Sequence, residues 1–279
     1  MTELKRVGTE QFMALGIGAA IAVIVPIVIA VIWTVRKKER FTTVLAGAAA
    51  FLLFAVVLEK TIQNVLVFPT QMGLDDHAVS QFINARPILW AFVVGLFPGV
   101  FEETGRLITF KTVLRNRRNR ETSISYGIGH GGIEVLFILG STYITYIVYG
   151  LMINSGSFQA IVDQAAAQAP DQVEAIYSTA AQIAGIGFAD ISLGLAERVF
   201  AFLFHVGASI LVFYAARDKG RFWLYPLAVL LHTAMDTFAA LCMTKVIVVS
   251  TWAVEAVVAA AGILIFFSAW ILLYKRDKE

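Results

Sequence analysis

Seven long apolar runs take up most of the chain, and runs of this length are stable only away from water. They lie at about 11–35, 41–67, 87–114, 122–151, 190–216, 222–244 and 247–274 of the 279 residues. A helix needs about 20 mainly apolar residues to cross a bilayer, so each run is long enough for one crossing. The runs lack the alternation of polar and apolar residues that is typical of outer-membrane barrels. We therefore predict an all-α, polytopic membrane protein with about seven transmembrane helices.

The composition fits this class and excludes several others. Apolar residues make up 58% of the chain and charged residues only 15%, whereas soluble domains have about 45–50% and 25%. An ordinary cytosolic enzyme, a nucleic-acid-binding protein and a disordered chain are therefore excluded. A single cysteine, Cys242, rules out an internal disulfide and a CxxC motif. We predict a location in the cell membrane, with the lipid bilayer as surroundings and no nucleic-acid partner.

The positive charges predict how the helices are oriented. Fifteen of the 22 lysines and arginines fall in alternate connections or at the C-terminus, such as 36–40 and 111–120. Connections rich in Lys and Arg stay in the cytoplasm, so we predict an outside N-terminus and a cytoplasmic C-terminus. The longest connection, 155–189, would then lie outside, and its alanine-rich sequence favours a helix or a helix pair. We predict one integral membrane domain over 1–279.

Ionisable side chains within the apolar runs carry the functional signal, because each costs at least about 2.5–3.5 kcal/mol at mid-bilayer. Five of these side chains, on four different helices, lie at one predicted depth. Each is roughly 12–18 Å from the nearest cytoplasmic Lys or Arg. Taken singly, such residues are usually interhelical hydrogen-bonding contacts or self-neutralised pairs. Their shared depth instead predicts a common site, with an opening on the cytoplasmic side. The five residues are Glu102, Glu103, His130, His205 and His232.

Neighbouring residues add detail to this predicted site. Pro98 removes a helix hydrogen bond just before the two carboxylates, and Arg106 follows them by one turn. Glu134 and Asp236 each follow a histidine of the layer at i+4, on the same helix face. The glycines at 127, 129, 131 and 132 allow either close helix packing or space at the His130 imidazole. Other charged residues are predicted near the outer interface, where side chains can snorkel: Glu59, Lys60, Glu197, Arg198 and Glu255.

Taken in the order in which they follow one another along the chain, these motifs resemble those of the glutamate- and histidine-dependent membrane proteases. These include the CAAX-processing and bacteriocin-processing (Abi) proteins, the PrsW type and, most similar here, the YhfC-type intramembrane metalloproteases. Two residues separate Glu103 from Arg106, as in the PrsW pattern, whereas the CAAX pattern has three. The segments that carry the resemblance lie within about 87–244 and are 102–106 (EETGR), 129–134 (GHGGIE), 197–205 and 232–236.

The resemblance implies hydrolysis of a peptide or membrane-protein substrate by an activated water within the membrane. It assigns the activation of water to Glu102 or Glu103 with His130, and metal binding or oxyanion stabilisation to His205, His232 and Asp236. The chemistry of these residues leaves two mechanisms open. Three imidazoles, or two with a carboxylate, suit Zn²⁺ with an open position for water, whereas a Glu–His pair can also act without metal. The predicted catalytic residues are Glu102, Glu103, Arg106, His130, Glu134 and Asp236, and the predicted metal ligands are His130, His205 and His232.

A transporter is the alternative from a different functional class. The same buried Glu and His residues could line the path of a proton- or cation-coupled transporter. Two observations favour the protease: the chain shows no internal repeat, and the ionisable residues gather at one depth instead of spreading towards both faces. A catalytically silent membrane partner with the same fold is a third interpretation. Nothing in the residues favours a particular oligomeric state.

Overall fold

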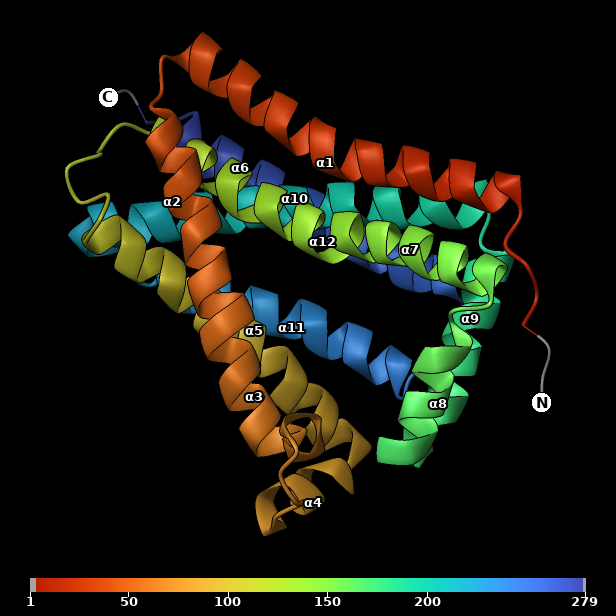
Figure 1. Cartoon of the computed structure of the whole chain (residues 1–279). Coiled ribbons are helices and arrows are strands. Elements are labelled where there is room, and N and C mark those ends of the chain that lie inside the picture. Colours follow the sequence, from red (N-terminus) through yellow and green to blue (C-terminus); the bar gives the residue numbers. More distant parts are fainter. Residues whose placement is uncertain (1–3, 278–279) are drawn as a thin grey trace. The chain divides into compact units, whose positions relative to one another are not determined.

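The structure is a computed structural model that describes residues 4–277, apart from the side chain of Asp171, and consists of helices joined by short turns (Figure 1). No strand occurs within this range. Seven helical segments of the described residues are long and apolar enough to cross a membrane. The predicted all-α, multi-pass membrane architecture is therefore confirmed, while the orientation of the two termini stays a prediction.

The segments begin and end within a few residues of the predicted positions. They are Thr9–Lys37, Phe41–Val67, Pro87–Lys111, Glu121–Ser155, Phe188–Arg217, Lys219–Met243 and Thr251–Tyr274. Their constituent helices are α1 (Thr9–Lys37), α2 (Phe41–Phe51), η1 (Leu52–Glu59), α3 (Lys60–Val67), α5 (Pro87–Lys111), α6 (Glu121–Val135), η3 (Leu136–Gly140), α7 (Ser141–Ser155), α10 (Phe188–Arg217), η5 (Lys219–Arg221), α11 (Leu224–Met243), α12 (Thr251–Ala269) and η6 (Trp270–Tyr274). The helices outside these segments are η2 (Pro69–Met72), α4 (Ala78–Asn84), α8 (Gln159–Gln168), η4 (Pro170–Gln172) and α9 (Val173–Gly185).

The described chain divides into two compact units. The first contains the residues up to Ile27 together with Glu134–Arg198, and the second contains Val28–Ile133 and the residues from Val199 onward. The boundaries between the units fall within α1, α6 and α10. The prediction of one integral membrane domain stays a prediction.

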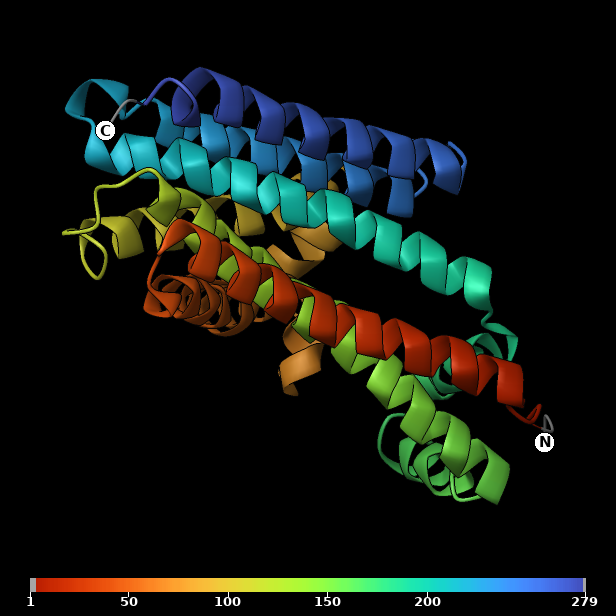
Figure 2. The same ribbon diagram turned by 90° about the horizontal axis from the view of Figure 1, so that it is seen from above.

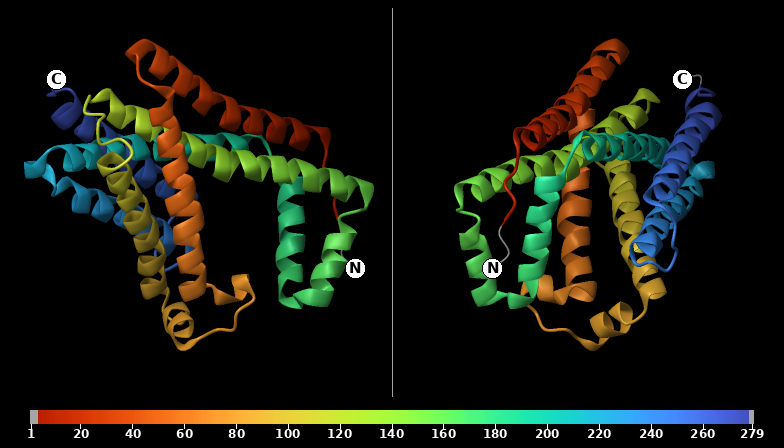
Figure 3. Two further views of the ribbon diagram at one scale, coloured as in Figure 1. Left: turned by 60° about the vertical axis from the view of Figure 1, so that its left-hand side comes forward. Right: turned by 90° about the vertical axis from the view of Figure 1, so that its right-hand side faces the viewer.

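The first unit contains the long connection that was predicted to be helical. Its helices α8 and α9 form an antiparallel pair (Figure 3), one of the two helical arrangements predicted for this connection. Phe158, Val162 and Ile183 are buried together between them. At the end of α7, the Asn154 side chain accepts a hydrogen bond from the Val7 backbone N–H at 2.9 Å and donates one to its carbonyl at 2.8 Å. Apolar packing thus holds α8 against α9. The side-chain amide of Asn154 holds the N-terminal segment at Val7.

The second unit brings its helices close together at glycines. In α2 and α6 the glycines are reciprocal: a Cβ on Gly129 would overlap the Val44 carbonyl, and a Cβ on Gly47 would overlap the Tyr126 carbonyl. On α10, Gly207 approaches the backbone of α12 at Phe266, and the two helices run side by side (Figure 2). Gly129 therefore serves close packing, the first of the two uses predicted for the glycines around His130.

Gly129→Ala should lower the free energy of unfolding by about 1–3 kcal/mol, the usual cost of overpacking. The added methyl group would meet backbone atoms of α2. These atoms cannot move aside as the end of a flexible side chain could. Thermal unfolding in detergent measures the effect. Gly16→Ala is the matched control, because Gly16 lies inside α1 and a Cβ added there would meet no atom within 4 Å. Alanine there improves helix propensity by about 1 kcal/mol, so an equal loss of stability in both variants would contradict the packing role.

Candidate functional site

The five residues predicted to share one layer do meet, within the second unit. Glu102 and Glu103 come from α5, and the three histidines come from α6, α10 and α11. All five are buried, with at most 6% of any residue exposed. The ring centroids of His130 and His205 are 5.1 Å apart, and those of His205 and His232 are 5.5 Å apart. Four helices thus contribute to one cluster of carboxylates and imidazoles.

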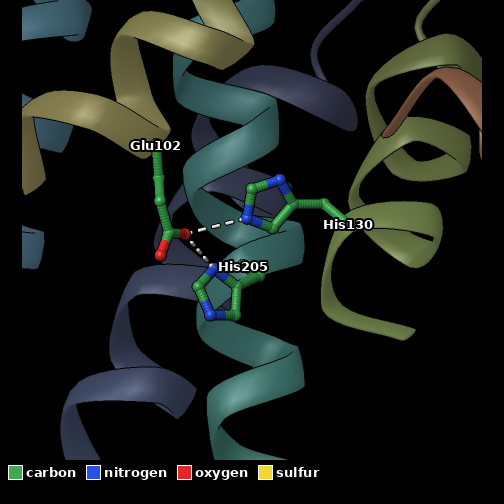
Figure 4. A group of neighbouring side chains, drawn as sticks. All are labelled: Glu102, His130 and His205. Carbon is green, nitrogen blue, oxygen red and sulfur yellow. Dashed lines mark hydrogen bonds and ion pairs between the residues drawn. The ribbon is translucent and has the colours of Figure 1, made fainter. Parts of the chain in front are cut away.

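The Glu102 carboxylate points toward two of the imidazoles (Figure 4). Its Oε2 atom is 2.8 Å from His130 Nε2 and 3.8 Å from His205 Nδ1. One ligand atom from each of these three residues lies within 4.8 Å of the other two. Two imidazole nitrogens and one carboxylate oxygen are a donor set that zinc accepts in catalytic sites. This group could therefore hold a metal ion.

Glu103 points to a different histidine, although it is the next residue on the same helix. Its Oε1 atom lies 2.8 Å from His232 Nδ1, and on the other side of that ring Nε2 lies 3.5 Å from Asp236 Oδ2. The other carboxylate oxygen, Glu103 Oε2, is buried and has no hydrogen-bond partner among the described residues. His232 therefore pairs with a carboxylate outside the group of Glu102, His130 and His205, and its predicted role as a metal ligand stays a prediction.

Arg106 links the two halves of the cluster. Its Nη1 atom donates to Glu103 Oε1, and its Nη2 atom donates to His205 Nδ1 at 2.6 Å. The same Nη2 atom lies 3.7 Å from Glu102 Oε2. Arg106 thus contacts both of the carboxylates that come one turn before it in the sequence. Because an unpaired buried charge is costly, this guanidinium is what allows two adjacent carboxylates to lie in a buried site.

Glu134 takes part in an ion pair of the first unit. Arg198 Nη1 donates to Glu134 Oε1 at 2.9 Å, and Nη2 of the same arginine contacts Glu197 Oε1. Only 7% of Glu134 is exposed. The catalytic role predicted for Glu134 stays a prediction.

Glu59 is a residue that the sequence interpretation missed. It was predicted to snorkel at the outer interface, but only 2% of it is exposed, whereas the side chain of its partner Lys60, 3.2 Å away, is 58% exposed. Glu59 also interacts electrostatically with Glu102 and His232. Spacing could have revealed it: Phe51, Ala55 and Glu59 follow one another at i+4 and are all buried. The ring of Phe51 lies 5.2 Å from that of His130, so this face of the segment points inward.

Comparisons with known proteins extend the resemblance beyond the motifs. The model of the YhfC intramembrane metalloprotease family matches residues 21–258, which include every residue of the cluster. A Bacillus subtilis (strain 168) protein, described as "Uncharacterized membrane protein YhfC", is 30% identical over 272 residues, or 97% of this chain and 98% of its own length. No solved structure matches. The resemblance seen in the motifs thus extends over almost the whole sequence, and this multi-pass membrane protein belongs to the YhfC intramembrane metalloprotease family.

Proposed function

We propose that this protein is an intramembrane endopeptidase that hydrolyses peptide bonds with a divalent metal ion, which we infer to be Zn²⁺. The observation that carries the proposal is the buried group formed by Glu102, His130 and His205. The description of its family as metalloproteases supports it. The substrate would be a peptide or a membrane protein that reaches this site within the bilayer.

The identity and the burial of the ligand group suit a catalytic zinc ion. Catalytic zinc is held by three protein ligands, in some hydrolases two His and one Glu, with a further position left open. The three residues come from α5, α6 and α10 and are all buried, so bulk water is largely excluded from the donor atoms. When bound, the ion acts as a Lewis acid that activates water and polarises a carbonyl group. Glu102, His130 and His205 would hold it.

Glu103 is placed to act as the general base. A base must offer an unoccupied acceptor within reach of the water that it deprotonates, and Glu103 Oε2 is a buried carboxylate oxygen without a partner among the described residues. Hydrolysis then balances without another reagent: Glu103 takes a proton from water and returns it to the amine nitrogen of the leaving peptide. The two neighbouring glutamates thus receive separate roles in this proposal, one as a ligand and one as the base.

The remaining residues hold this base in place. Arg106 and His232 both contact Glu103 Oε1, which leaves Oε2 as the reactive oxygen. Asp236 lies next to the far side of the His232 ring, so it positions the imidazole that contacts the base. His232 can also donate a hydrogen bond to the oxyanion that forms on the substrate carbonyl.

The proposal is tested with purified protein in liposomes and a pool of synthetic transmembrane-helix peptides, with cleavage detected by mass spectrometry. We expect cleavage to stop when o-phenanthroline removes metal and to return when Zn²⁺ is added. His205→Ala should lose both bound zinc, measured by elemental analysis, and cleavage.

His77→Ala is the matched control, because His77 is a histidine outside the cluster. It caps α4 by accepting from the Ser80 backbone N–H, and its Nε2 lies 2.8 Å from the Val65 carbonyl oxygen. Loss of a helix cap costs about 0.5–2 kcal/mol, but zinc content and cleavage should remain. Cleavage that survives both the chelator and His205→Ala would overturn the metal mechanism. Proton or cation flux that depends on His205, without any cleavage, would support the transporter instead.

A further inference from the structure

Arg106 contacts two of the three residues that form the proposed metal-ligand group. Its Nη2 atom lies 2.6 Å from His205 Nδ1 and 3.7 Å from Glu102 Oε2. The arginine is completely buried, so bulk water cannot replace these contacts of the guanidinium. One positive group of the protein therefore lies against the atoms that would receive a positive metal ion.

The hydrogen bond to His205 uses an electron pair that a metal would also need. A guanidinium only donates hydrogen bonds, so His205 Nδ1 is the acceptor in this contact. A neutral imidazole nitrogen has one lone pair, and Nδ1 is the nitrogen of His205 whose contact with Glu102 is 3.8 Å. Arg106 and a metal ion therefore cannot both bind His205 Nδ1, and two cations at such short range also repel each other.

A second acceptor for Arg106 is available beside the first. Among the described residues, Glu103 Oε2 and Arg106 Nε are both buried and without a hydrogen-bond partner, and Glu103 Oε1 already accepts from Nη1. Arginine and carboxylate commonly form two parallel hydrogen bonds, and Nη2, once released from His205, would complete such a pair by donating to Oε2 beside the existing bond from Nη1 to Oε1. A carboxylate oxygen has two lone pairs, so Glu103 Oε2 can hold the guanidinium after it leaves His205 and can still accept a proton from water.

We infer that Arg106 is a built-in competitor for the metal ion, exchanging its hydrogen bond with His205 for a second one with Glu103 when the ion binds. This inference rests on the proposed metal site. Without metal, Arg106 compensates the buried carboxylates; with metal, Glu103 keeps the displaced guanidinium paired. The metal affinity then includes the cost of moving Arg106. The same holds for any protein whose binding-competent state is only partly populated. Arg106 is accordingly a positioning residue, not a ligand.

Zinc affinity, measured at fixed pH by competition with a fluorescent chelator, tests this exchange without any substrate. Arg106→Gln removes the competing cation, so its dissociation constant for Zn²⁺ should fall by about tenfold, within the range that outer-shell changes produce. Glu103→Gln should raise the constant by a similar factor, because Arg106 loses the carboxylate that would receive it. In the double variant, the effect of Glu103→Gln should disappear, since no guanidinium remains to be received.

The outcomes separate this inference from the proposed function. Weaker or unchanged zinc binding by Arg106→Gln would overturn the role of Arg106 and leave the metal site intact. An undiminished effect of Glu103→Gln in the double variant would mean that the two residues act independently, and this would also overturn the exchange. If Arg106→Gln does not fold, a wild-type affinity in Glu103→Gln decides against the inference. Zinc binding by none of the proteins, wild type included, would overturn the metal site itself.

Discussion

Glu102→Gln and Glu103→Gln should both abolish peptide cleavage, but only the first should abolish zinc binding. Glu102 contributes an oxygen to the group of possible metal ligands, and an amide is a much poorer zinc ligand than a carboxylate. Glu103 carries the unsatisfied oxygen Oε2, and its amide cannot accept a proton. General acid–base catalysis contributes about 10²–10⁴-fold, so Glu103→Gln should lose at least about a hundredfold in kcat with zinc present at saturation.

Elemental analysis and cleavage of the same peptide pool, carried out on each variant, measure these effects. Glu255→Gln is the control, because it removes a carboxylate from α12, a helix that contributes no residue to the cluster. Both zinc content and cleavage should be retained in this control. If Glu103→Gln cleaves at the wild-type rate, Glu103 is not the base; if Glu102→Gln still binds zinc with wild-type affinity, Glu102 is not a ligand.

Arg198→Met should lower the free energy of unfolding by about 1–3 kcal/mol, because it removes a charged donor from a partly buried ion pair and leaves Glu134 with one partner fewer. Glu134, its partner at 2.9 Å, is 7% exposed, so water can compensate the remaining carboxylate only poorly. Thermal unfolding in detergent should show a fall in Tm of several degrees. A Tm within about 2 °C of the wild-type value, the shift that corresponds to a small effect in a chain of this size, would contradict this prediction.

The double variant Glu134→Gln with Arg198→Met also tests the catalytic role predicted for Glu134. Replacing both charges removes the mostly buried carboxylate that Arg198 compensates, so most of the stability should return. If Glu134 takes part in catalysis, cleavage stays lost in this stable variant. If its only role is to pair with Arg198, cleavage returns together with the stability.

Much of the fold and the composition of the cluster could be predicted, because both follow from helix geometry in a bilayer. A constant rise of 1.5 Å per residue converts sequence distance into depth, and this was enough to group Glu102, His130 and His232. Successive apolar runs likewise gave seven spans that the structure confirms.

The separate environments of Glu102 and Glu103 could not be predicted in the same way. Neighbouring residues on a helix point about 100° apart, so the two carboxylates contact different histidines although they share Arg106. Which partner each one meets depends on how α6, α10 and α11 surround α5, and the sequence pattern does not determine that. Depth alone was also misleading for Glu59, because it ignored which face of the helix is turned inward.

The reciprocal glycine contacts have a consequence for how freely related sequences can diverge. At the level of His130, α2 and α6 touch through main-chain atoms at Gly47 and Gly129. Main-chain atoms are the same in every amino acid, so the spacing of these helices does not depend on side-chain volumes along the seam. Many residues of α2 can therefore change without moving the imidazole, provided that the two glycines remain. A chain that shares only 30% of its residues with a relative can in this way keep the histidine in register.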